Sequence, residues 1–245
     1  MSAAQEIRAA IARVHALRAE CSCLPALNGA LRAIKEVQSR RFAGSYADLL
    51  RSEQYADAAS FFLDELYGVR DYTERDNQFA RVAGGLERLF PDAVVQTAVR
   101  IAGLHSLTEE LDMAMARRWL LDTGGSEAAR YARAWASVGR PADRRAQLAT
   151  VLAVGNDMQS LTRKRGLRPL LHLMRTPAAA AGLSALQQFL EIGFDTFAAM
   201  TRRSGGASQF LATIAEREEA LMILLDAGDP VASETALLPL LGQVR

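Results

Sequence analysis

Apolar residues recur at steps of three and four residues along most of this 245-residue chain. This spacing matches the 3.6-residue period of the α-helix and places the apolar side chains on one face. The most regular stripe has spacings of 3, 4, 3, 4 and 3 and consists of Leu183, Leu186, Leu190, Gly193, Phe197 and Met200. A chain with such stripes along most of its length is expected to form helices that bury these faces against one another.

The composition agrees with a helical interpretation. Hydrophobic residues make up 50% of the chain and charged residues 23%, proportions that are typical of globular and not of disordered chains. Ala and Leu, two strong helix formers, dominate the apolar fraction, whereas aromatic residues make up only 7%. We therefore predict an all-α fold, a compact multi-helix bundle of about nine or ten helices.

Short Gly and Pro signals separate the predicted helices, and no Pro- or Ser-rich linker divides the chain. Gly124-Gly125 is the best candidate for a boundary, but two residues form a turn more often than a domain linker. We expect a single helical domain at residues 1–227. The tail at residues 228–245 contains Pro230 and Pro239, and we expect it to be irregular.

One helix start is predicted near the middle of the chain. Gly103 interrupts an apolar pattern that begins at Asp92, and Ser106 followed by Glu109 matches a capping box. We therefore expect a new helix to begin at Ser106, with Glu109 reaching back to its first turn.

The charge balance and the apolar stretches bear on partners and location. The 29 basic and 28 acidic residues give a net charge of +1, so the basic excess that is typical of nucleic-acid binding is missing. The longest uncharged run, Thr176 to Leu190, falls short of the ~18–20 apolar residues that span a bilayer. The first residues do not resemble a signal peptide. We expect a cytoplasmic protein without a membrane segment.

Three histidines are candidates for cofactor binding, namely His15, His105 and His172. A lone histidine in an apolar helix can bind haem iron, although it is more often a partly buried residue with one hydrogen-bond partner. His105 and Glu109 could share a helix face, but the capping role explains Glu109 better. The chain contains no Glu-x-x-His pair, and we predict no metal site.

The densest polar group is predicted at one helix–helix corner, next to Phe61-Phe62. Residues of both charges are mixed there, and the candidates are Tyr67, Arg70, Asp71, Arg75, Asp76 and Arg81. Such a corner can be a salt-bridged clamp that fixes the angle between two helices, or an exposed binding epitope. Of the two, the mixed charges favour the clamp.

The segment Phe61–Tyr72, with the sequence FFLDELYGVRDY, resembles the hallmark of a family of uncharacterised bacterial all-helical proteins. Further segments that are similar to this family surround Arg75-Asp76, Gly182-Leu183 and Phe210–Ile214. The likeness extends over about residues 45–225. It implies a helical fold and a single unit, and it implies no catalytic residues.

The sequence contains no Gly-x-Ser-x-Gly, Walker or dinucleotide-binding motif. Our first hypothesis is therefore a non-enzymatic protein–protein interaction or regulatory protein, with a protein as partner. One alternative is a ligand- or cofactor-binding protein, with haem as the most specific candidate. The other is an enzyme with an unfamiliar site near Tyr67, Arg70 and Asp71. A homodimer could form through the stripe at residues 183–200, although such a stripe is more often buried within a single chain.

Overall fold

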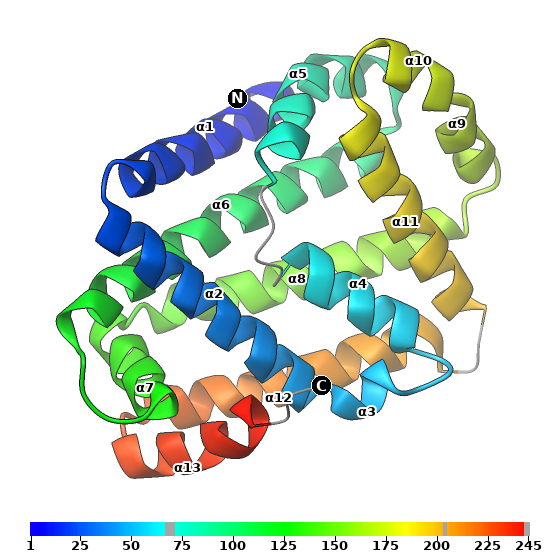
Figure 1. The fold of residues 1–245 in the computed structure, drawn as a ribbon. Coiled ribbons are helices and arrows are strands. Elements are labelled where there is room, and N and C mark those ends of the chain that lie inside the picture. Colours follow the sequence, from blue (N-terminus) through cyan, green and yellow to red (C-terminus); the bar gives the residue numbers. More distant parts are fainter. Residues whose placement is uncertain (67–71, 203–204, 243–245) are drawn as a thin grey trace. The chain divides into compact units, whose positions relative to one another are not determined.

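A computed structural model describes residues 1–66, 72–202 and 205–242, and these residues form helices and no strand (Figure 1). The all-α prediction is confirmed. The described helices are α1 (Ala3–Ser22), α2 (Pro25–Ser45), α3 (Ala47–Leu50), α4 (Ala56–Leu66), α5 (Thr73–Leu89), α6 (Asp92–Leu121), α7 (Glu127–Val138), α8 (Pro141–Thr162), α9 (Leu167–Leu173), α10 (Arg175–Ala180), α11 (Ser184–Thr201), α12 (Gly206–Asp226) and α13 (Pro230–Leu241). The predicted number of nine or ten is too low because short helices such as α3, α9 and α10 show little periodicity.

The predicted helix start at Ser106 is wrong. Helix α6 runs through 30 residues without a break, and Ser106 is buried in its interior. A glycine inside a helix costs only about 1 kcal/mol relative to alanine, so Gly103 does not end α6. Glu109 accepts a hydrogen bond from Lys35 on α2 instead of capping a helix.

The C-terminal segment is also more regular than predicted, because residues 230–241 form helix α13. The Asp229 side chain caps this helix by accepting from the backbone N–H of Val231 and of Ala232. Pro230 occupies the first helical position, where no N–H is needed. The expectation of an irregular tail is therefore wrong for residues 230–241, and residues 243–245 of the tail lie outside the described residues.

The chain divides into two compact units, each assembled from three stretches. Unit 1 consists of Met1–Val14, Arg70–Ser106 and Thr150–Leu211, and unit 2 consists of His15–Val69, Leu107–Ala149 and Ala212–Arg245. Four of the boundaries fall inside helices, namely α1, α6, α8 and α12, and the boundary between Val69 and Arg70 falls between α4 and α5. The expectation of one domain stays a prediction.

The core of unit 1 joins α1 to α5 and α6. Ile7 and Ile11 of α1 pack with Ala83 of α5 and with Ala98 and Ala102 of α6. The apolar stripe of α11 is largely buried as well, and its buried members are Leu186, Gly193, Phe197 and Met200. Small residues allow these helices to approach closely.

The core of unit 2 is larger and joins α1, α2, α6, α7, α12 and α13. Its aromatic members are Trp119, Tyr131 and Trp135, and α13 contributes Leu237 and Leu241. Helix α13 packs on α2 and α7 (Figure 1). At the contact with α2, a Cβ atom on Gly44 would lie 2.2 Å from the Leu240 carbonyl oxygen, so only glycine fits there.

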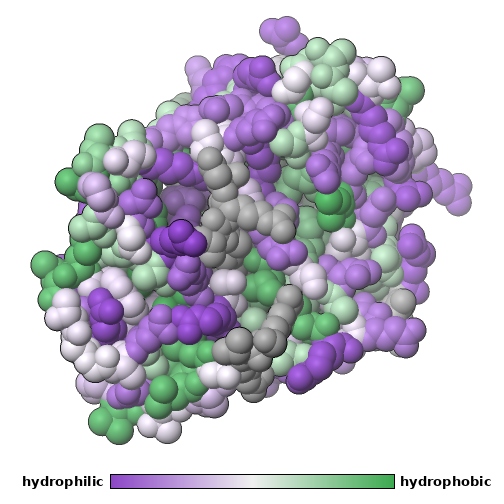
Figure 2. All heavy atoms as spheres, in the orientation of Figure 1, coloured by the Kyte–Doolittle hydropathy of each residue, from purple (hydrophilic) through white to green (hydrophobic). Residues whose placement is uncertain are grey.

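On the face shown in Figure 2, hydrophilic side chains are interspersed with apolar ones. Within the described part of the chain, each helix is too short or too polar to cross a bilayer.

Candidate functional site

The predicted polar corner is only partly described, because Tyr67, Arg70 and Asp71 lie outside the described residues. Arg75 and Asp76 lie on α5. Asp76 is buried, and its Oδ2 atom lies 2.9 Å from Nε2 of His105 on α6.

The Arg75 guanidinium stacks on the rings of Tyr72 and Phe189, with its carbon 4.2 Å and 4.6 Å from the two centroids. Phe189 belongs to α11. The contacts of Arg75 and Asp76 therefore tie α5 to both α6 and α11.

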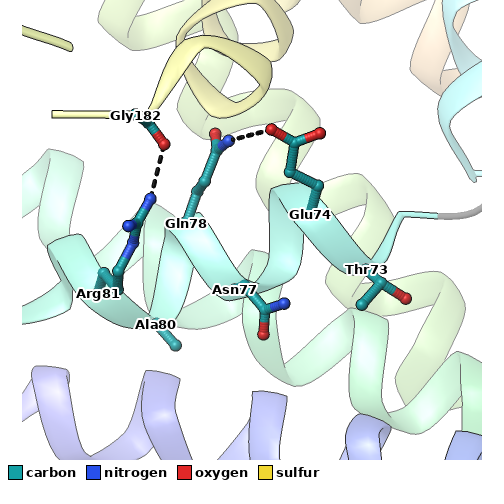
Figure 3. Close-up of a pocket in the computed structure, with 7 residues that line it drawn as sticks. All are labelled: Thr73, Glu74, Asn77, Gln78, Ala80, Arg81 and Gly182. Atoms are coloured by element: carbon teal, nitrogen blue, oxygen red, sulfur yellow. Dashed lines mark hydrogen bonds between the residues drawn. The ribbon is translucent and has the colours of Figure 1, made fainter. Parts of the chain in front are cut away.

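Two further residues of α5 bind the backbone before and within α11, and Figure 3 shows the contact of Arg81 with Gly182. Gln78 accepts a hydrogen bond of 2.8 Å from the Leu186 N–H, in the first turn of α11, and donates to Glu74. Arg81 donates to the Gly182 carbonyl oxygen at 2.6 Å. These residues line an open surface depression. Gln78 and Arg81 therefore tie α5 to the start of α11, and the clamp at the predicted corner stays a prediction.

The three candidate histidines have different surroundings. His105 lies against Asp76, and His172 has its Nδ1 atom 4.0 Å from Glu191. The Nε2 atom of His15 is buried and has no hydrogen-bond partner among the described residues. Across the same residues, no three or more His, Cys, Asp or Glu side chains are grouped to hold a metal ion. Cofactor binding by these histidines stays a prediction.

A different set of polar residues is buried in unit 2, and we call it the polar seam. Several of its charged members are less than a tenth exposed. The seam consists of Lys35, Gln38 and Arg41 on α2, Glu109 and Asp112 on α6, Tyr131 on α7, Arg144 on α8 and Glu218 on α12. Charged residues are rarely buried unless they are paired or bind something.

Helical spacing brings these side chains together. Lys35, Gln38 and Arg41 are three residues apart along α2 and lie on one face of it. Glu109 and Asp112 have the same spacing on α6. The Lys35 ammonium donates to Glu109 at 2.8 Å, and the Gln38 amide donates to Asp112 at 2.9 Å. The face of α2 that carries Lys35 and Gln38 therefore packs against the face of α6 that carries Glu109 and Asp112.

Four charges of the seam are matched in two ion pairs. Lys35 pairs with Glu109, and Arg41 pairs with Glu218. Glu218 also accepts a hydrogen bond of 2.8 Å from the Tyr46 hydroxyl. Matched buried charges of this kind are consistent with a fixed internal network.

Asp112 is not matched in this way. Its Oδ1 atom accepts from Gln38, and no cationic group of the described residues lies within 4.0 Å of its carboxylate. Burial raises the pKa of Asp112 from its ordinary value of 3.8 to about 6, and the nearby Glu109 acts in the same direction. Lys35 opposes this rise. Asp112 is thus a buried carboxylate that is poorly compensated.

Arg144 is the unmatched cation of the seam. It is 4% exposed, and its guanidinium carbon lies 3.4 Å from the centroid of the Trp135 ring. Its Nε and Nη2 atoms are buried and have no hydrogen-bond partner in the described chain. Burial lowers the pKa of Arg144 below its ordinary value. A buried donor without an acceptor costs about 1–3 kcal/mol, and more when it is charged.

Two other arginines of the same chain show what the Nε–Nη2 edge of a guanidinium group binds. Arg168 uses Nε and Nη2 to donate to the two carboxylate oxygens of Asp195, at 2.7 and 3.2 Å. Arg175 donates from the same two atoms to Glu191. This paired geometry is the one in which guanidinium groups bind carboxylate or phosphate. Arg144 presents the same edge in a buried position, with no acceptor on it from the described chain.

A family model described as a domain of unknown function (DUF8198) matches residues 18–232. The chain belongs to this family. The resemblance to an uncharacterised family is therefore confirmed, and the whole polar seam of the DUF8198 protein, from Lys35 to Glu218, lies within the matched residues. No curated protein and no solved structure matches the chain.

The sequence of the DUF8198 protein carried two signals for the seam that our sequence interpretation missed. One is the three-residue spacing of Lys35, Gln38 and Arg41. The other is the position of Arg144 near the N-terminus of α8, where the helix dipole disfavours a cation. Neither signal shows that these residues meet, because that depends on how distant helices pack.

Proposed function

We propose that this DUF8198 protein is a non-enzymatic ligand-binding protein that holds the carboxylate of a small molecule on Arg144, inside unit 2. The observation that carries the proposal is the buried Nε–Nη2 edge of Arg144, which has no acceptor in the described chain. A bound carboxylate would supply two charge-assisted hydrogen bonds to that edge.

The surroundings of Arg144 support a prearranged site. Trp135 donates a hydrogen bond of 2.9 Å from Nε1 to Asp226, which fixes the orientation of its ring. The Arg144 guanidinium carbon lies 3.4 Å from the centroid of this ring, and this contact restricts the freedom of the side chain. A donor pair that is already oriented loses little freedom when a ligand binds, which favours affinity.

Other functional expectations from the sequence stay predictions. They include a regulatory role, a protein partner and a cytoplasmic, bacterial setting. The homodimer contact at residues 183–200 also stays a prediction, since Leu186, Phe197 and Met200 are buried in the single chain whereas Leu190 and Ile192 are exposed. A ligand-binding role is compatible with regulation, since a bound ligand stabilises the state to which it binds.

Thermal unfolding in sodium acetate tests the proposal, with sodium chloride at equal ionic strength as the reference. We expect acetate to raise the melting temperature of the wild-type protein, because a ligand that binds only the folded state stabilises it. Arg144→Gln should abolish this rise. Arg168→Gln is the matched control, because it removes the same Nε–Nη2 edge from an exposed arginine that is already paired with Asp195.

The outcome that contradicts the proposal is an Arg144→Gln protein that responds to acetate as the wild type does. Carbon-13 relaxation of labelled acetate gives a second measurement that does not depend on unfolding. Native mass spectrometry of the protein as purified would show whether a small molecule is retained.

A further inference from the structure

Among the charged residues of the polar seam, Asp112 and Arg144 form no ion pair with any described residue, whereas Glu109 is contacted by Arg18 as well as by Lys35. Lys35 pairs with Glu109, and Arg41 pairs with Glu218. Asp112 and Arg144 remain, and they do not pair with each other, because no charged atoms of the two residues lie within 4.0 Å.

The two unmatched residues belong to the same buried cluster and are close enough for each to act on the charge of the other. Tyr131 is buried, and the charges of Asp112 and Arg144 act on the pKa of its hydroxyl in opposite directions. Arg144 and Asp112 also act on each other's charge, each favouring the ionised form of the other. A molecule that binds one of them therefore lies in the electrostatic field of the other.

Each of the two residues has binding atoms to spare. Asp112 accepts from Gln38 through Oδ1, whereas its Oδ2 atom receives no hydrogen bond from the described residues. Arg144 has free donors on Nε and Nη2. Asp112 can thus accept a hydrogen bond from an additional, positively charged donor, and Arg144 can donate to an additional, negatively charged acceptor.

We infer that the ligand is a small zwitterion, an amino acid or a related compound, whose carboxylate binds Arg144 and whose ammonium group binds Asp112. This inference rests on the proposed function, since both share the contact of a carboxylate with Arg144.

Charge balance favours this class over the alternatives. A simple carboxylate would match Arg144 and leave Asp112 as an uncompensated buried anion next to the ligand. A simple amine would match Asp112 and leave Arg144 uncompensated. Leaving one buried charge without its partner is strongly unfavourable, typically by several kcal/mol. A zwitterion matches both residues and leaves the net charge of the seam unchanged.

Alanine, propionate and ethylamine are suitable probes because they have similar size and differ in their charged groups. Titration calorimetry at pH 7 should give an affinity for alanine at least tenfold higher than for propionate, and binding of ethylamine weaker than that of alanine. Asp112→Asn should remove the preference for alanine over propionate. Arg144→Gln should abolish the binding of both. Asp195→Asn, in the exposed pair with Arg168, is the matched control and should leave all affinities unchanged.

The pH dependence of binding gives a second readout in the wild-type protein. Burial raises the pKa of Asp112 to about 6. An ammonium group binds the ionised carboxylate, so the affinity for alanine should rise as the pH increases from 5 to 7. The affinity for propionate should fall over the same range, since ionised Asp112 repels it. The charged or titratable residues that act on this carboxylate are Lys35 on α2, Glu109 on α6, Tyr131 on α7 and Arg144 on α8, and Arg18 on α1 contacts Glu109.

The possible results separate the two proposals. If propionate binds in an Arg144-dependent manner and alanine binds no more tightly, the zwitterion inference is overturned and the carboxylate site stands. If neither probe binds at millimolar concentration, both are overturned. Opposite pH slopes for alanine and propionate support the inference even when the Asp112→Asn protein does not fold.

Discussion

At the scale of single residues, Arg144 is poorly placed for stability. Its guanidinium is buried without an acceptor from the described chain, and it lies near the positive end of the α8 dipole. The Trp135 ring offsets part of this cost, because a stacked cation and aromatic ring attract each other by about 0.5–2 kcal/mol. Residues that reduce stability without a structural benefit are typical of binding sites.

This argument predicts the effect of Arg144→Met in ligand-free protein. We expect the free energy of unfolding to increase by about 1–3 kcal/mol, because the change replaces an unsatisfied buried cation by an apolar side chain of similar length. Urea unfolding, after removal of retained ligand by unfolding and refolding, measures the difference. A decrease of several kcal/mol would contradict the argument, since it would show that the guanidinium is structurally engaged.

At the scale of helices, periodicity predicts which face of a helix is buried better than it predicts where the helix begins and ends. The apolar faces of α5, α7 and α11 follow from local spacing, because each turn of a helix repeats the same environment. The start at Ser106 was wrong because a Ser-x-x-Glu pattern is also compatible with the interior of a long helix. Residues 230–241 were misassigned because Pro230 and Pro239 were taken to prevent a helix, yet one of them occupies the first helical position.

The contact between α2 and α13 leads to a second prediction. Gly44→Ala should lower the free energy of unfolding by about 2 kcal/mol or more, since the new methyl group would overlap the backbone of Leu240. Gly29→Ala, on the same helix, meets no atom within 4 Å and should be neutral or stabilise by up to about 1 kcal/mol. Thermal unfolding of the two variants measures both effects, and equal melting temperatures would contradict the described packing.

At the scale of the whole molecule, each unit combines three separate stretches of the chain. The seam collects residues from position 35 to position 218 on five helices. Local patterns assign Lys35 to a polar face and Glu109 to a helix start, but they do not show that the two side chains meet. The fold class was therefore predictable from the sequence, whereas the seam and the unmatched pair in it were not.

The buried carboxylate in the seam also affects how the stability of the whole protein depends on pH. The pKa of Asp112 is raised in the folded protein, so its contribution to stability is fully present below pH 3.8 and is lost as the pH rises through about 6. The rise from 3.8 to about 6 corresponds to roughly 3 kcal/mol. Asp112→Asn should therefore stabilise the protein more at pH 7.5 than at pH 4.5. Denaturant unfolding at both pH values tests this, and parallel wild-type and variant profiles would refute it.

The stacking of Arg144 on Trp135 makes the indole an optical reporter within the protein itself. The chain has two tryptophans, Trp119 and Trp135, and both are buried in unit 2. The arginine over Trp119 is Arg130, which donates to two backbone carbonyl oxygens and is held by them. Neutralising the cation over Trp135 changes the electric field across its ring, and with it the wavelength of its fluorescence. Occupancy of the site should thus be visible in the intrinsic emission of the unlabelled protein.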